Sequence, residues 1–213
     1  MRTEINAAEW RRALIARHGM ERQQRLAAAT VAVCGLGGLG SHIAPALARA
    51  GVGRLLLLDF DRVELSNLHR QQYKAAQIGC YKTEALRQNL LEMAPYVQIV
   101  AHTVRLMTEN LPRLLAEAQV VCEALDEAEA KAMLCDVVLS QMPDKYLVAA
   151  SGMAGWGSAN TIRTRKITEH FYLCGDGSSD VAAEGSLTAA RVMVCAAHQA
   201  QAVLQILTGE TVE

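Results

Sequence analysis

A short apolar segment runs directly into a glycine-rich turn, and this junction constrains the fold more than any other part of the chain. Residues 30–34 (TVAVC) precede residues 35–40 (GLGGLG), and residues 41–50 then have helical character. Glycines permit a sharp turn and let another group approach the backbone without meeting a side chain. The first turn of a helix adds unpaired N–H groups and the positive end of the helix dipole. The junction therefore predicts a strand, a turn and a helix that together bind a phosphate group.

Apolar runs alternate with helical patterns along the first two thirds of the chain. Residues 54–59 (RLLLLD) form a continuous apolar run, which is typical of a parallel strand buried on both faces. The alternation predicts an α/β fold, with a Rossmann-like, mainly parallel sheet and helices on both faces. Strands are expected at 30–34, 54–59, 97–103, 120–125, 146–150 and 160–167, and helices at 5–28 (one or two), 41–50, 82–93, 108–117, 127–142 and 187–207.

The pattern changes after residue 151. An alternating stretch and a flexible loop at 175–186 lead to the last predicted helix, which is apolar on most faces. We expect a C-terminal antiparallel extension and a long helix that is buried in the core or in a subunit interface. Pro45 lies inside the helix that follows the glycines, which predicts either a local kink or a later helix start.

Length and composition favour a single domain. We expect N-terminal helices at 1–28, a nucleotide-binding core at 29–155, and a crossover loop and C-terminal helix at 156–213. The net charge of −1 gives no general attraction to nucleic acid or to acidic membranes, and no apolar run is long enough to cross a bilayer. The six cysteines include no Cys-x-x-Cys pair, which favours a reducing cytoplasm and argues against a zinc site. Cys34 and Cys122 lie on predicted strands and are interpreted as core residues.

Polar residues after the second predicted strand narrow the choice of nucleotide. Asp59 ends that strand nineteen residues after Gly40, where an acid can bind ribose hydroxyls. The glycines and Asp59 alone fit NAD as well as ATP, and they also fit a turn that only packs a helix on the sheet. Arg70 and Lys82 can neutralise phosphate oxygens, and Asn67 can hydrogen-bond to ribose or phosphate, as a triphosphate requires.

A second acid lies at the end of another predicted strand. Asp126 is placed at the edge where α/β sheets bind their ligands, and an isolated carboxylate there suits Mg²⁺ bridged to phosphate oxygens. Asp61 is compatible both with a role toward ATP or Mg²⁺ and with capping its own turn. Together these residues predict a Mg-ATP site. A nucleotide-binding scaffold without turnover is disfavoured, because the charged residues that turnover needs are present.

At these motifs the chain resembles the ThiF/MoeB/HesA family, the bacterial relatives of ubiquitin-activating enzymes. The length of the chain and the segments at 123–126 (EALD) and 198–200 (HQA) are most similar to the short ThiF-like branch of thiamine biosynthesis. The elements that carry the resemblance are GLGGLG at 35–40, DFD at 59–61, SNLHRQ at 66–71, GCYK at 79–82 and Asp126.

The resemblance implies an ATP-dependent adenylyltransferase. The C-terminal glycine carboxylate of a ubiquitin-like, ThiS-like sulfur carrier ending in Gly-Gly would attack the α-phosphate of ATP, forming an acyl-adenylate and releasing pyrophosphate. Sulfur from a cysteine desulfurase or another donor would then displace AMP, which supplies the thiamine thiazole. Two alternatives stay open: adenylation of another carboxylate, of the tRNA-modification type, and an NAD(P)-dependent oxidoreductase.

The resemblance also implies residue roles and a homodimer. Asp59 would hold the ribose, Gly38 would approach the phosphates, and Asp126 would coordinate Mg²⁺. The implied nucleotide-binding residues are Gly35, Gly37, Gly38, Gly40, Asp59, Asp61, Asn67, Arg70, Gln71 and Lys82, and the implied catalytic residues are Arg11, Arg70, Lys82 and Asp126.

Several further positions carry expectations of their own. Arg11 would reach the active site of the partner subunit, with Arg12 and Arg17 as competitors for that role. Cys174 borders the crossover loop, where some family members have a reactive cysteine, but no activating group is evident beside it. Glu127 stands where the family often has Asn. His69 and His198 are interpreted as structural residues.

Overall fold

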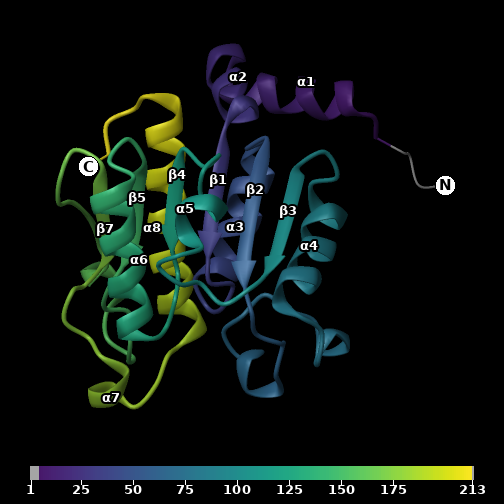
Figure 1. Cartoon of the computed structure of the whole chain (residues 1–213). Coiled ribbons are helices and arrows are strands. Elements are labelled where there is room, and N and C mark those ends of the chain that lie inside the picture. The colour runs from purple at the N-terminus through teal and green to yellow at the C-terminus, as the bar shows by residue number, and fades with distance from the viewer. Residues whose placement is uncertain (1–4, 213) are drawn as a thin grey trace.

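The computed structural model describes residues 5–212, and within this range the chain forms a seven-stranded sheet (Figure 1). The strand order is β3-β2-β1-β4-β5-β7-β6, in which only β6 runs antiparallel to its neighbour. The strands are β1 (Thr30–Cys34), β2 (Arg54–Asp59), β3 (Gln98–Thr103), β4 (Val120–Glu123), β5 (Tyr146–Ala150), β6 (Arg163–Lys166) and β7 (Phe171–Gly175). The predicted α/β fold with a mainly parallel sheet is confirmed.

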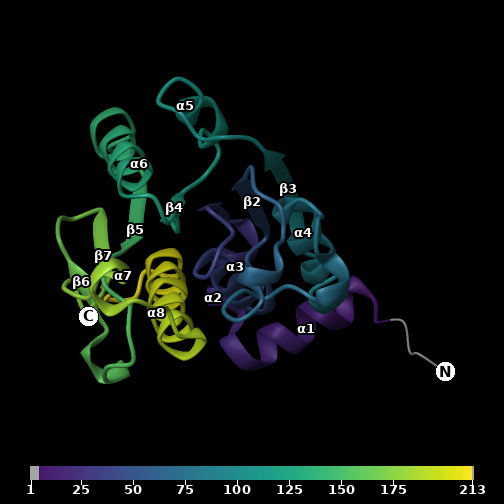
Figure 2. The same ribbon diagram turned by 90° about the horizontal axis from the view of Figure 1, so that it is seen from below.

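Helices cover both faces of the sheet, because side chains alternate between its faces along each strand. Val31 and Val33 of β1 pack with the helices of one face, whereas Ala32 and Cys34 pack with those of the other. Figure 2 shows α5 and α6 on one face and α3, α4 and α8 on the other. The helices are α1 (Ala7–His18), α2 (Met20–Ala28), α3 (Gly40–Ala50), α4 (Lys82–Met93), α5 (Leu111–Leu114), α6 (Ala128–Gln141), α7 (Val181–Glu184) and α8 (Ala189–Thr208), with 3₁₀ turns η1 (Leu65–Asn67), η2 (Ala75–Gln77) and η3 (Ala159–Thr161).

The largest differences from the predicted elements lie after β5. The strand β7 was not expected, since its five residues follow a polar turn and show no clear alternation. The loop predicted at 175–186 contains the short helix α7, and the strand predicted at 160–167 is confined to β6. The helix expected at 108–117 is reduced to the single turn α5.

Pro45 does not delay the start of its helix. The helix α3 begins at Gly40 and continues through Pro45 to Ala50, so a later start, the alternative to the expected kink, is wrong. The last helix, α8, buries one face that includes Val192 and Cys195, while Met193 on another face is 46% exposed.

The parallel strands place their carboxyl ends along one edge of the sheet. The glycine turn follows β1, Asp59 ends β2, and Asp126 follows β4, so the topology gathers all three at this edge. The helices α1 and α2 lie at the opposite end, where β1 begins (Figure 1). Along residues 5–212, none of the helices combines the length and the apolar character that crossing a bilayer would require.

Candidate functional site

A cleft of about 570 Å³ opens at the carboxyl edge of the sheet. Loops that follow β1, β2, β3, β4, β5 and β7 form its walls, which is the usual position of a ligand site in an open α/β sheet. From the set predicted by sequence, the lining contains Gly35, Gly37, Gly38, Asp59, Asp61, Arg70, Gln71, Lys82 and Asp126.

The glycines of the turn differ in what surrounds them. Gly35 has a φ of +90°, and a Cβ atom there would lie 2.6 Å from the carbonyl oxygen of Ala124. A Cβ at Gly40 would lie 1.9 Å from the carbonyl oxygen of Gly35, so neither position accepts a side chain. A Cβ at Gly37 would meet only the side chain of Gln71, at 3.6 Å. Gly35 and Gly40 therefore allow the turn to pack, and Gly37 leaves backbone open to the cleft.

Asp59 ties the glycine turn to the end of β2. Its carboxylate is 8% exposed and accepts hydrogen bonds from the N–H groups of Leu36 (2.6 Å) and Asp61 (2.8 Å). Burial raises the pKa of Asp59 above its ordinary value, and the positive charge of Lys82 and the two amide bonds oppose part of this rise. A carboxylate offers about four acceptor positions, so Asp59 retains capacity for ribose hydroxyls beside the turn.

Lys82 is the buried cation of the site. It begins α4, is 5% exposed and donates from Nζ to Asp61 Oδ2 at 2.7 Å. This contact gives Asp61 a defined partner. The sequence alone was compatible with two roles for Asp61, one toward ATP or Mg²⁺ and one in capping its own turn. An ammonium group carries three donors, so Lys82 can still donate to a phosphate in the cleft.

Arg70 is held more loosely than Lys82. Its Nη1 lies 3.5 Å from the carbonyl oxygen of Ser66 and 3.4 Å from Nε2 of His69, and both contacts are long. The half-buried Arg70 side chain lines the cleft, where its guanidinium can donate to a ligand.

Asp126 is an exposed carboxylate on the turn between β4 and α6. In the described residues, no group of three or more His, Cys, Asp or Glu side chains is arranged to hold a metal ion. Mg²⁺ bound to a nucleotide needs only one or two protein carboxylates, because phosphates and water supply the other ligands. The single carboxylate of Asp126 in the cleft wall fits that requirement.

An ion pair that sequence reasoning missed supports the Asp126 turn. Glu123 is 1% exposed at the end of β4, and both of its carboxylate oxygens accept from Lys131 Nζ at 2.9 Å. Glu123 also accepts from the N–H of Leu125 (2.7 Å), and Lys131 also donates to the carbonyl oxygen of Ala150 (3.2 Å). A glutamate inside the apolar run at 120–125 was the available signal, because a buried charge requires a partner.

Three residues of the predicted set do not line the cleft. Gly40 packs inside the turn, and the Nδ2 group of Asn67 donates to Ser66 Oγ at 3.4 Å. Arg11 is exposed on α1, at the end of the sheet opposite the cleft, as are the competing arginines 12 and 17 (Figure 1). Within one chain Arg11 therefore lies far from the site, and its role in a partner subunit stays a prediction.

Cys174 is completely buried on β7, and burial raises its pKa to about 11. At pH 8 only about one thiol in a thousand would then be ionised, so we expect iodoacetamide to leave Cys174 unmodified in the native protein. Cys80 is exposed and serves as the internal control, since it should be alkylated within minutes. Peptide mass spectrometry measures both sites. Alkylation of Cys174 at the rate of Cys80 would contradict this expectation and would favour a reactive role.

The fold and cleft can be compared with known proteins. The profile of the ThiF family matches residues 10–213. "Adenylyltransferase and sulfurtransferase UBA4" of Candida glabrata is 36% identical over 150 residues, which is 70% of this chain and 34% of that protein. "Adenylyltransferase and sulfurtransferase MOCS3" of Aedes aegypti is 36% identical over 67% of this chain and 32% of its own length. The chain thus spans about a third of the length of these curated relatives.

Solved structures share the fold over nearly the whole chain. E. coli tRNA N6-threonylcarbamoyladenosine dehydratase, TcdA, in complex with ATP superposes with a TM-score of 0.84 at 20% identity, covering 97% of this chain and 98% of that one. E. coli MccB with MccA-N7isoASN superposes with a TM-score of 0.70 at 18% identity, covering 90% and 60%. These likenesses show that the fold is shared. The match over residues 10–213 decides the family: this chain belongs to the ThiF family.

Proposed function

We propose that this protein is an ATP-dependent adenylyltransferase that activates a carboxylate. The observation that carries the proposal is the meeting, in one cleft, of the open glycine turn, the buried acid Asp59, the cations Arg70 and Lys82, and the carboxylate of Asp126. The names of the relatives, which are adenylyltransferases and sulfurtransferases, support the same reaction.

The cleft suggests an orientation for the nucleotide. Asp59 would accept the ribose hydroxyls, and Val104 and Leu106, which follow β3, offer an apolar wall for the base. The phosphates would then extend across Gly37 toward Asp126, which follows the neighbouring strand β4. This orientation leaves the side of the cleft that is formed by the loops after β5 and β7 for the incoming carboxylate.

The proposed reaction is a single displacement at phosphorus. An oxygen of the substrate carboxylate forms a bond to the α-phosphorus of ATP, the bond from that phosphorus to the bridging oxygen breaks, and pyrophosphate leaves with the electron pair. Mg²⁺ held by Asp126 would neutralise phosphate charge. Arg70 and Lys82 would orient the phosphates and stabilise the negative charge that develops, so positioning and electrostatics supply the catalysis.

The finer proposal concerns the substrate. We infer a ubiquitin-like sulfur carrier ending in Gly-Gly, whose adenylate a sulfur donor converts to a thiocarboxylate for thiamine biosynthesis. The motifs at 123–126 and 198–200 support this branch, and a homodimer would bring Arg11 of one subunit to the cleft of the other. A carboxylate on a modified tRNA is the competing substrate. The test includes this substrate because the fold is similar to that of TcdA.

The test is exchange of labelled pyrophosphate into ATP. With Mg²⁺ and a ThiS-type carrier ending in Gly-Gly, label should enter ATP, and a carrier that lacks the last glycine should give none. Exchange that requires N6-threonylcarbamoyladenosine tRNA instead would replace the carrier with the tRNA substrate. No exchange with either substrate would refute adenylation.

A further inference from the structure

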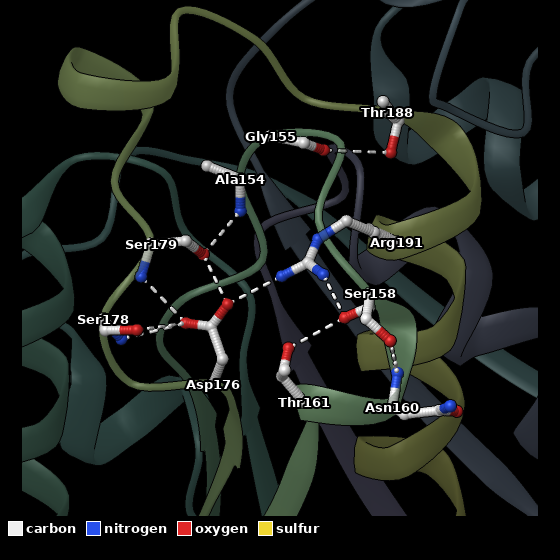
Figure 3. A network of polar contacts seen from close by, with 10 residues as sticks. All are labelled: Ala154, Gly155, Ser158, Asn160, Thr161, Asp176, Ser178, Ser179, Thr188 and Arg191. Carbon is white, nitrogen blue, oxygen red and sulfur yellow. Dashed lines mark hydrogen bonds and ion pairs between the residues drawn. The ribbon is translucent and has the colours of Figure 1, made fainter.

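The carboxylate of Asp176 helps to hold the crossover segment, residues 176–188, which follows β7 (Figure 3). Its Oδ1 accepts from the N–H groups of Ser178 (2.9 Å) and Ser179 (2.8 Å), and its Oδ2 accepts from the hydroxyl of Ser179 (2.7 Å). The hydroxyl oxygen of Ser179 in turn accepts from the N–H of Ala154 at 3.0 Å. Asp176 thus folds the start of the crossover segment and attaches it to the loop after β5.

Arg191 joins the same carboxylate to two other segments. It projects from the first turn of α8, is 4% exposed, and donates from Nη2 to Asp176 Oδ2 at 2.6 Å. Its Nη1 donates to the carbonyl oxygen of Ser158, in the loop after β5. Figure 3 shows the guanidinium between Asp176 and Ser158. One side chain therefore connects the crossover segment, the loop after β5 and the helix α8.

The backbones approach each other closely at this junction, so two glycines there accept no side chain. A Cβ atom at Gly152 would lie 2.1 Å from Asp176 Oδ1, and one at Gly175 would lie 1.9 Å from the carbonyl oxygen of Ser151. The N–H groups of Asp176 and Gly177 donate to the carbonyl oxygens of Gly152 and Ser151. The crossover segment is thereby fixed against the end of β5.

All three segments that Arg191 connects contribute to one end of the cleft. This end is lined by residues 150–154, by residues 177–181, and by Leu187 and Val192. Asp59 and Lys82 line the other end, because β2 and β5 are separated in the sheet by β1 and β4. Neither Asp176 nor Arg191 belongs to the lining itself, so any effect on the site acts through the segments they hold.

We propose that Asp176 and Arg191 are positioning residues that fix the crossover segment as the wall for the incoming carboxylate substrate, and that they set the KM for that substrate without contributing to ATP binding. This inference rests on the proposed adenylation for its substrate, but not for the wall itself. Hydrogen bonds hold Asp176 ionised under ordinary conditions: burial would raise its pKa, but the Ser178 and Ser179 donors and Arg191 lower it to about 2. The attachment therefore persists across the working pH range.

Two variants test the Asp176–Arg191 ion pair separately from the hydrogen bonds that Asp176 accepts within its own turn. Asp176→Asn keeps an oxygen acceptor for the amides of Ser178 and Ser179 but places an NH₂ group opposite Arg191. Arg191→Lys keeps the charge and removes the fork that reaches both Asp176 and Ser158. Lys166→Gln is the control, since it breaks an exposed ion pair with Glu169 outside the cleft lining.

Amide hydrogen exchange on the protein without substrates tests the wall, and kinetics tests its role. We expect exchange across 177–187 to accelerate about tenfold or more in Asp176→Asn and less in Arg191→Lys, with α3 and the Lys166→Gln control unchanged. The KM for the Gly-Gly carrier should rise about tenfold while the Kd for ATP, measured by calorimetry, stays within about twofold.

The two inferences fail in different ways. Unchanged amide exchange at 177–187 in both variants would overturn the positioning role, whatever the reaction proves to be. An equal loss of ATP affinity and carrier KM would also overturn it, because that result describes general destabilisation. If the wild-type protein binds ATP but catalyses no pyrophosphate exchange with either substrate, the proposed adenylation is refuted. Amide hydrogen exchange then still decides whether Asp176 and Arg191 hold the wall.

Discussion

Replacing Asp126 by alanine is expected to lower pyrophosphate–ATP exchange by at least about a hundredfold while the protein stays folded. Asp126 is exposed on a turn, so its removal should cost little stability. The loss should appear in kcat more than in the KM for ATP, because the phosphate charge grows in the transition state. Exchange rates over a Mg²⁺ titration provide the measurement.

A matched variant controls for the charge that is lost. Glu129 is an exposed acid in the first turn of α6, three residues along the chain, and it does not line the cleft. Glu129→Ala should exchange pyrophosphate at close to the wild-type rate. Near-normal exchange by Asp126→Ala would remove Asp126 from the reaction and leave the proposed Mg²⁺ site without a ligand.

Replacing Lys131 by methionine should give the largest loss of stability, about 3–5 kcal/mol in the free energy of unfolding. The change leaves the carboxylate of Glu123, which is 1% exposed, without the cation that contacts both its oxygens. Burying an unpaired charge costs far more than losing an exposed ion pair. Urea denaturation followed by circular dichroism measures the change.

A double variant tests whether the unpaired charge is the cause. Glu123→Gln combined with Lys131→Met removes both charges but keeps an acceptor for the N–H of Leu125. We expect the double variant to recover about half of the lost stability or more. If the single variant unfolds at the wild-type urea concentration, or the double variant is no more stable than the single one, the ion pair does not stabilise the Asp126 turn.

The edge of the sheet that carries the site could be predicted from sequence, because it follows from local patterns. Each of these apolar runs predicts a parallel strand. The residues directly after such a strand must lie at the carboxyl edge of the sheet. Gly35 and Asp126 follow two such runs and Asp59 ends a third, and the structure brings all three residues to one cleft. The roles of these residues toward ATP stay predictions.

The remaining parts of the site depend on contacts between distant segments. Arg191 was a lone charge in an apolar helix, and its partner Asp176 lies fifteen residues earlier, directly after a strand that the pattern did not reveal. Glu123 and Lys131 are eight residues apart and belong to a strand and a helix, so neither helix nor strand periodicity pairs them. Sequence shows that such charges need partners, and only the packed chain shows which ones.

The unequal surroundings of the glycines affect how natural variation in this turn should be interpreted. An alanine at Gly40 would collide with backbone and would be removed through loss of the folded protein, whatever the reaction demands. An alanine at Gly37 meets only ordinary contact distances, so selection against it would have to come from the ligand. Relatives that have abandoned catalysis would thus be free to change the third position of GLGGLG while retaining the last. A relative could therefore keep most of the GLGGLG motif and still have lost catalytic activity.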